Sequence, residues 1–177
     1  QQIEGKELFE GKAGCIHCHN GALLTDEKYY NLGLPENEIF EESELHQITF
    51  RFEQYAKGVP EDIYRSVKTD LGLYYRMKDR ESMGKFRTPT LRYLEYSSPY
   101  MHNGVFFDLI EVVEFYNEGG GEDAIERNFG HSTKTPLLQP LGLTDAEMEA
   151  IVAFLESLTG DEITMEAPEL PKDAVMK

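Results

Sequence analysis

The segment GCIHCH at residues 14–19 constrains this chain more than any other, because it contains both of its cysteines. Cys15 and Cys18 are separated by two residues, and His19 follows the second cysteine directly. Cys-x-x-Cys-His is the attachment sequence of a c-type haem: the thiols form thioethers with one porphyrin, and the histidine becomes the proximal iron ligand. The spacing therefore predicts one covalently bound haem c.

Three other kinds of site can contain two cysteines at this spacing. A structural zinc site usually has four ligands, and His46, His102 and His131 are scattered without metal-ligand spacing. A thioredoxin-like dithiol follows a buried apolar strand, whereas residues 4–14 are polar and predict a helix. A disulfide across two residues would be strained. Haem attachment is favoured, and these three uses stand as its alternatives.

Length and charge narrow the function classes. A chain of 177 residues is long enough for one domain with a hydrophobic core. Its net charge of −16 argues against a nucleic-acid partner. An acidic surface suits docking with a basic redox partner, although it also serves solubility alone. We expect no transmembrane segment, because the apolar runs are short.

The expected location follows from the haem. In bacteria this kind of haem attachment takes place outside the cytoplasm, so we expect a periplasmic or otherwise exported protein. On this interpretation Gln1 is a mature terminus left after cleavage of a signal peptide.

Two capping boxes predict the clearest helices. Asp108 with Glu111 precedes apolar residues at helical spacing, which stop at the glycines 119–121. Thr144 with Glu147 precedes a second apolar stripe that contains Met148. Both stripes predict helices that pack one face against a core.

The sequence signals for the remaining elements are weaker. Residues 4–14 predict a short helix that ends at glycine, and residues 60–67 predict a helix that begins at Pro60. Residues 20–60 are interpreted as irregular, with an acidic solvated segment at 35–47. Residues 72–92 are interpreted as loop with short turns, and no segment predicts a strand. The pattern as a whole indicates a mostly helical domain with long loops.

The other face of the iron determines what a haem domain can do. A methionine ligand gives six-coordinate iron suited to electron transfer, and an open face binds peroxide. Met101 is the favoured distal ligand, because it lies in a turn between Pro99 and Gly104. His102 and Tyr116 compete with it, and the alternative for Met101 is a methionine that fills the core.

The other methionines are assigned elsewhere. Met148 is predicted to lie in the core, and Met77 and Met83, in a charged loop, are predicted to lie at the surface. Met165 and Met176 lie in or near the C-terminal tail.

Three segments, in this order, resemble the C-terminal haem domain of bacterial di-haem cytochrome c peroxidases: GKAGCIHCHNGALLTD, GKFRTPTLRYLEYSSPYMHNGVF and DLIEVVEFYNEGGG. That family includes the enzyme that matures the tryptophan tryptophylquinone cofactor of methylamine dehydrogenase. LGLTDAEMEAIVAFLESLTG is similar to the family's closing helix, so the resemblance runs from about Gly5 to Gly160.

The resemblance implies an all-α, cytochrome c-like domain at residues 1–160, with long loops wrapped around one c-type haem. It implies that the N- and C-terminal helices cross near the haem, and residues 161–177 are expected to form a C-terminal surface strap. In the family, the C-terminal haem relays electrons to an N-terminal haem that reacts with peroxide. This chain has one Cys-x-x-Cys-His and so matches the relay half.

The resemblance also assigns residues. Cys15 and Cys18 match the thioether cysteines, and His19 matches the proximal ligand. Tyr116 matches a position that supplies a distal methionine in peroxidases and a distal tyrosine in the quinone-maturing enzyme. Met101 and Tyr116 are therefore rival distal ligands, of which we favour Met101.

Further residues match with less support. Ser97 and Pro99 match positions whose backbone carbonyls hold a calcium between two domains, so calcium is a second expected cofactor that depends on the other domain. Arg87 and Arg92 flank TPTL and are expected to face the haem propionates, unless they are ordinary surface arginines. Tyr93 replaces an asparagine that is common in the family.

These observations predict a periplasmic mono-haem electron-transfer domain. The expected partners are a redox protein with a basic docking face and a second haem-bearing domain or subunit. The alternative function is a haem peroxidase-like enzyme, or a subunit of one, that reacts with hydrogen peroxide. A thiol oxidoreductase without haem is a third, weaker interpretation.

Overall fold

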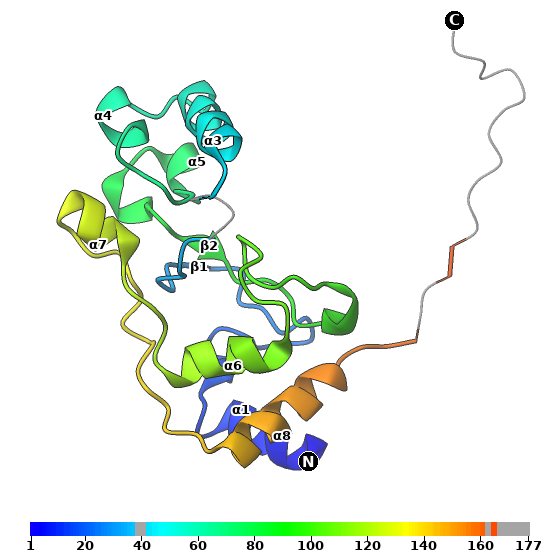
Figure 1. Ribbon diagram of the computed structural model, residues 1–177. Helices are drawn as coiled ribbons and strands as arrows, with labels where there is room; N and C mark the ends of the chain where they lie inside the picture. The colour runs from blue at the N-terminus through cyan, green and yellow to red at the C-terminus, as the bar shows by residue number, and fades with distance from the viewer. Residues whose placement is uncertain (38–41, 162–163, 166–177) are drawn as a thin grey trace, which may run out of the picture.

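The computed structural model describes residues 1–37, 42–161 and 164–165, and these are mostly helical with long loops (Figure 1). The elements are, in chain order, α1 (Gln2–Glu10), η1 (Cys15–His17), β1 (Tyr29–Tyr30), α3 (Glu44–Ala56), α4 (Glu61–Tyr64), α5 (Tyr74–Met77), η2 (Arg80–Ser82), β2 (Phe86–Arg87), η3 (Leu94–Tyr96), α6 (Leu109–Asn117), α7 (Ala124–Phe129) and α8 (Asp145–Glu156). The mostly helical prediction is confirmed. None of the described helices is both long and apolar enough to cross a membrane.

The first and last described helices pack across each other, with α6 beside α8 (Figure 1). Gly5 makes the crossing of α1 and α8 possible, since a Cβ there would lie 1.8 Å from the carbonyl oxygen of Ala150. The rings of Phe9 and Phe154 meet edge to face at 5.2 Å between centroids. We call this cluster the terminal-helix core; its buried residues are Phe9, Ala13, Leu109, Val113, Leu143, Met148, Ile151, Phe154 and Leu155.

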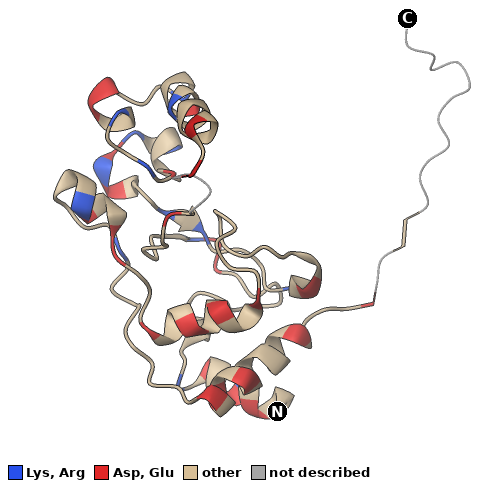
Figure 2. Cartoon of the chain, viewed as in Figure 1, with Lys and Arg blue, Asp and Glu red and all other residues tan. Residues whose placement is uncertain are grey.

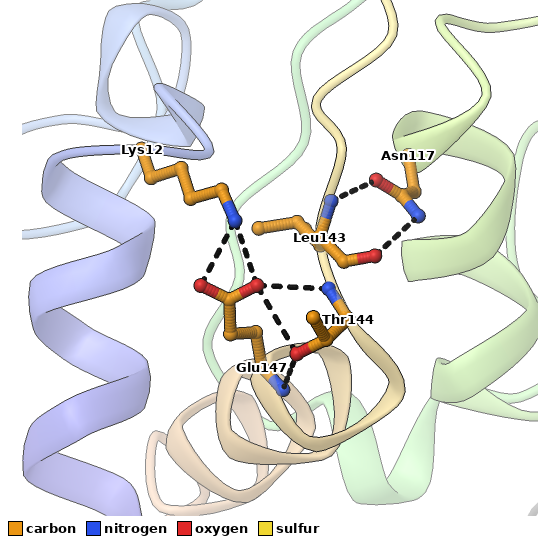
Figure 3. A network of polar contacts seen from close by, with 5 residues as sticks. All are labelled: Lys12, Asn117, Leu143, Thr144 and Glu147. Carbon is orange, nitrogen blue, oxygen red and sulfur yellow. Dashed lines mark hydrogen bonds and ion pairs between the residues drawn. The ribbon is translucent and has the colours of Figure 1, made fainter.

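A polar network ties these three helices together at one end (Figure 3). Lys12, just after α1, donates to both carboxylate oxygens of Glu147 at 2.9 and 2.7 Å. Glu147 also accepts the backbone N–H of Thr144 at 2.8 Å, which forms the predicted capping box of α8. Asn117, at the end of α6, accepts the N–H of Leu143 at 2.8 Å and donates to its carbonyl at 3.2 Å. One network therefore fixes the start of α8 against the ends of α1 and α6.

A second cluster lies where α4, α5 and α7 meet, away from α1 and α8 (Figure 1). We call it the mid-chain core; its buried residues are Val59, Ile63, Val67, Leu71, Tyr74, Met83 and Ile125. Met83 is fully buried there, so the prediction that it lies at the surface is wrong. Met77 is 57% exposed and Met148 is buried in the terminal-helix core, as predicted.

The charged neighbours of Met83 explain that error. Residues 79–82 form the turn η2, in which Asp79 accepts the backbone N–H of Ser82 at 2.9 Å. The turn leaves Arg80 and Glu81 exposed and directs Met83 inward. A charged stretch of sequence here surrounds one inward-pointing apolar side chain.

Loops from distant parts of the chain are joined beside the mid-chain core. β1 and β2 pair antiparallel, with Tyr29 opposite Arg87 and Tyr30 opposite Phe86. The sequence predicted no strand, because each is two residues long and exists only through its partner. A buried carboxylate nearby, Asp123, accepts from Asn31 at 2.9 Å and from the backbone N–H of Thr133 at 2.8 Å.

The helix predictions fare unevenly. The helices predicted from the two capping boxes are α6 and α8. α4 lies within the predicted 60–67, whereas α1 begins before the predicted 4–14 and ends at Glu10, before its last residue. The interpretation of 20–60 as irregular is wrong, since it contains α3, a helix of 13 residues whose N-cap is Ser43. Residues 166–177 of the expected strap lie outside the described residues.

Candidate functional site

The cysteine segment follows α1 and is held in a tight turn. Gly14 has a φ of 63°, a left-handed conformation that glycine adopts without strain. After it, Cys15 opens η1, and the backbone N–H of His19 donates to the Cys15 carbonyl at 2.9 Å. Both thiols are free and partly buried, and Cys15 packs against the terminal-helix core. The turn therefore presents two thiols and one imidazole together.

The imidazole of His19 is oriented through its Nδ1 nitrogen. Nδ1 lies 3.0 Å from the carbonyl oxygen of Leu24. Because a carbonyl only accepts hydrogen bonds, Nδ1 carries the proton and Nε2 carries the lone pair. Burial lowers the pKa of His19, although the carbonyls of Leu24 and Pro89 and the charge of Asp26 oppose this. The result is a neutral, oriented imidazole, which is the form that binds a metal ion.

The two thiols do not have the properties of a redox dithiol. Burial raises the pKa of Cys15 to about 11, and burial also raises the pKa of Cys18. Catalytic dithiols act as thiolates and have lowered pKa values. The element before the cysteines is the helix α1, where a thioredoxin-like site would have a strand. The geometry therefore disfavours the dithiol alternative.

The zinc alternative would need ligands besides the two cysteines. Within the described part of the chain, no group of three or more histidine, cysteine, aspartate or glutamate side chains is placed to hold a metal ion. Four-coordinate zinc would need two more ligands than the cysteines supply.

Tyr116 lies on α6. Burial raises the pKa of its phenol, and ionised Cys15 and Cys18 would raise it further. This coupling indicates that the rival distal ligand named by the sequence lies near the attachment cysteines. The neighbouring ring of Phe115 meets Tyr116 edge to face, with 5.6 Å between centroids.

Met101 lies in the loop between η3 and α6. Its φ is 68°, and its carbonyl accepts the N–H of Gly104 at 3.4 Å. The next residue, His102, stacks on Phe86 with ring centroids 3.5 Å apart. Although part of its surface is open to solvent, burial against its neighbours lowers the pKa of His102 to about 4. One face of the His102 ring, the other rival ligand, therefore packs against Phe86 of β2.

The two arginines take different positions. Arg92 donates through Nε and Nη2 to the carbonyl of Ala22, at 3.2 and 2.9 Å. It therefore fixes the loop that follows His19. Arg87 is exposed in β2, and its guanidinium lies 3.8 Å from the Glu27 carboxylate. Orientation toward haem propionates stays a prediction for both.

The predicted calcium positions lie together at the end of η3. The hydroxyl of Ser97 donates to the Leu94 carbonyl at 3.1 Å, and the peptide bond before Pro99 is cis. Calcium binding through the backbone carbonyls of Ser97 and Pro99 stays a prediction.

The structure adds residues around His19 that sequence reasoning missed. Leu24 aims its carbonyl at His19 from a left-handed conformation with a φ of 52°. Asp26 donates its backbone N–H to the Cys18 carbonyl at 2.8 Å, and its carboxylate accepts from the Tyr30 hydroxyl at 2.7 Å. The turn residues NGALLTD were visible in the sequence, but no spacing rule connects them to the histidine.

A hollow beside α6 and α7 lies away from the cysteine segment. It measures about 620 Å³, and residues 14–19 do not line it. Its walls combine the rings of Phe106 and Phe115 with several glutamates and Arg127. We therefore assign the site from the chemistry of its donor groups and not from this hollow.

The donor groups fit a c-type haem. Two free thiols stand at the right sequence spacing, and the adjacent imidazole is oriented through Nδ1. Tyr116 adds an oxygen donor within electrostatic reach of the cysteines. The fold and the site define a helical domain of the c-type haem-binding class.

Comparison with known proteins makes this class specific. No protein-family model matches the chain. The cytochrome-c peroxidase IdrP1 of Denitromonas iodatirespirans is 51% identical over 170 residues, which cover 96% of this chain and 43% of that protein. The methylamine utilization protein MauG of Paracoccus denitrificans is 35% identical over 154 residues, which cover 77% of this chain and 34% of that protein.

Solved structures agree with the sequences. A MauG-like protein associated with microbial copper homeostasis aligns with a TM-score of 0.65 and 28% identity, over 90% of this chain and 47% of that one. The diheme peroxidase BthA from Burkholderia thailandensis aligns with a TM-score of 0.58 over 89% of this chain and 42% of that one, and at 22% identity it supports the fold alone.

The chain belongs to the family of bacterial di-haem cytochrome c peroxidases and MauG proteins, which confirms the resemblance of its motifs. It spans less than half the length of the relatives that it matches.

Proposed function

We propose that this chain is a c-type cytochrome domain that carries one haem and transfers electrons. Cys15 and Cys18 would hold the porphyrin through thioethers, and Nε2 of His19 would bind the iron. The observation that carries the proposal is the hydrogen bond from Nδ1 of His19 to the Leu24 carbonyl, which orients the ring and places its lone pair on Nε2. When bound, such a haem supplies one reversible electron.

The distal ligand decides between electron transfer and peroxide chemistry. The electrostatic coupling of Tyr116 to the two cysteines supports Tyr116. Met101 is the rival that the sequence favours, and it lies in a turn in which its carbonyl accepts the Gly104 N–H. A thioether would give a higher reduction potential than a phenolate, which suits the relay of electrons.

Spectra of the purified holoprotein test both points. A six-coordinate spectrum that is unchanged by peroxide or cyanide supports electron transfer, and a high-spin ferric spectrum that shifts with either ligand supports a peroxidase. The variants M101A and Y116F identify the distal ligand, since only loss of the true ligand converts the wild-type spectrum. Unchanged spectra in both variants would exclude both residues.

The proposed partner is a redox protein with a basic docking face. Figure 2 shows acidic residues along α1, α6 and α8, the helices of the terminal-helix core. Charges of one sign on neighbouring helices speed the encounter with a partner of opposite sign. The rate of electron exchange with a basic cytochrome should therefore fall as salt increases, and a rate independent of salt would contradict this docking mode.

We also propose that a second haem-bearing domain or subunit works with this domain, in the periplasm or another exported location. The chain covers 43% of the length of the cytochrome-c peroxidase IdrP1, so the remainder of that relative has room for such a domain. The alternative function, a peroxidase or one subunit of a peroxidase, follows from the name of that relative. Copurification from the native host would reveal the companion and would separate the two.

A further inference from the structure

We propose that Asp26 lowers the reduction potential of the haem, as a fixed negative charge beside the proximal histidine. The inference rests on the proposed function, because it concerns the haem that His19 would bind. Asp26 would act on the haem through its charge and would not bind the iron.

Asp26 is held in place from several sides. Its backbone N–H donates to the Cys18 carbonyl at 2.8 Å, so the residue lies directly beside the attachment segment. Its Oδ2 accepts from the Tyr30 hydroxyl at 2.7 Å, and its Oδ1 accepts from the Lys28 N–H at 3.0 Å. A carboxylate with these donors keeps its position and its charge.

The pKa directions agree with this geometry. Burial acts to raise the pKa of Asp26, but hydrogen bonds, with Tyr30 the strongest, outweigh it and lower the pKa. The charge of Asp26 in turn acts to raise the pKa values of His19 and Cys18. The carboxylate is thus ionised at neutral pH and within electrostatic reach of the proximal histidine.

The effect on a haem follows from charge alone. The oxidised iron carries one more positive charge than the reduced iron, so a nearby carboxylate stabilises the oxidised state. Asp26 is partly exposed, so solvent and salt screen part of its charge, and the remainder still acts on His19. The same charge therefore lowers the potential of a haem on His19.

Lys28 acts in the opposite direction. Its ammonium charge lowers the pKa values of both Asp26 and Cys18. Its side chain is exposed, so its effect on the haem is smaller than that of Asp26. The pair provides two variants whose effects on potential differ in sign.

The test is a spectroelectrochemical titration of the holoprotein, with the variants D26N, E27Q, Y30F and K28Q. D26N should shift the midpoint potential upward, and K28Q should shift it downward by less. E27Q removes the same charge one residue away, at an exposed side chain that is paired with Arg87, and should shift the potential less than D26N. Y30F removes the hydrogen bond but keeps the charge, so its shift should be smaller than that of D26N.

The outcomes separate the inference from the proposed function. A D26N potential equal to that of the wild type or of E27Q would overturn the inference while the haem stays bound. A Y30F shift equal to that of D26N would overturn it too, since the hydrogen bond would then be the cause. If D26N fails to accumulate, K28Q decides, and an unshifted K28Q overturns the inference. A wild-type protein without haem overturns the proposed function itself.

Discussion

The terminal-helix core and the mid-chain core of this domain are built in different ways. In the first, α6 and α8 begin at capping boxes and pack with α1 across a glycine contact. In the second, the helices α4 and α5 have only four residues each, and loops supply much of the buried surface. The cysteine segment packs against the first core.

The difference shows which elements of the domain are specified by the local sequence. Helices with their own caps and apolar stripes are specified locally, although the core that they form joins residues far apart in sequence, such as Lys12 and Glu147. The mid-chain core is built from short helices and loops, mostly between residues 59 and 83, and the haem segment does not pack against it. Damage to the first core should therefore impair haem binding, whereas damage to the second should mainly lower stability.

The largest effect is expected at Gly5. In the variant G5A, the new Cβ would collide with the Ala150 carbonyl and force α1 away from α8. We expect a loss of about 4 kcal/mol in the free energy of unfolding, together with poor haem loading, measured by urea denaturation and Soret absorbance. The exposed E4A on the same helix serves as the control; a G5A protein as stable as E4A would show that the crossing is absent.

The mid-chain core should respond at Met83. M83A leaves a cavity among fully packed neighbours and should cost about 3 kcal/mol, while M77A, at an exposed position, should cost little. Haem loading of the folded M83A protein should stay normal, because Met83 does not contact the cysteine segment's core. Equal unfolding midpoints for the two variants would mean that Met83 is not buried.

Asp123 tests how the loops are joined. Burial acts to raise the pKa of Asp123, but hydrogen bonds from Ser132, Thr133, Lys134 and Ile125 outweigh it, so the pKa is lowered. Its contribution is complete above about pH 4, the unfolded value, and is lost as pH falls through the lowered folded pKa. D123N should therefore cost about 2 kcal/mol at pH 7 and progressively less in acid. A cost that does not change with pH would show that the charge is unimportant.

The smallest expected effect is at Asn117, in the network of Figure 3. N117A removes both hydrogen bonds to Leu143 and should cost about 1 kcal/mol, measured by thermal denaturation. N117D keeps the acceptor for the Leu143 N–H and should cost less than N117A. If the two variants are equally unstable, the hydrogen bond to the Leu143 N–H contributes nothing.

The elements that the sequence predicted are those with local signals. The capping boxes at Asp108 and Thr144 could be found from two residues each. The helix α3 had its own signals, a Ser43 cap and apolar residues Leu45, Ile48 and Phe52 at helical spacing, but the acidic run before it dominated the interpretation. The strands had none, since β1 pairs with a segment more than 50 positions away, and the burial of Met83 depends on core residues 9 to 42 positions away.

The residues of the site also differ in whether the local sequence could predict them. Cys15, Cys18 and His19 could be predicted because haem attachment is encoded in five adjacent residues. The Leu24 carbonyl and the Asp26 carboxylate could not, because the left-handed turn that brings them to His19 and Cys18 is visible only in three dimensions. The choice between Met101 and Tyr116 depends on which side chain faces the iron, and the motifs alone leave both possible.

The most direct test of the central claim is the intact mass and absorption spectrum of the chain, produced in a host that assembles c-type cytochromes. Covalent attachment predicts the polypeptide mass plus one haem, with Soret absorption that stays with the denatured polypeptide. The mass of the bare polypeptide, with no Soret band, would contradict the account.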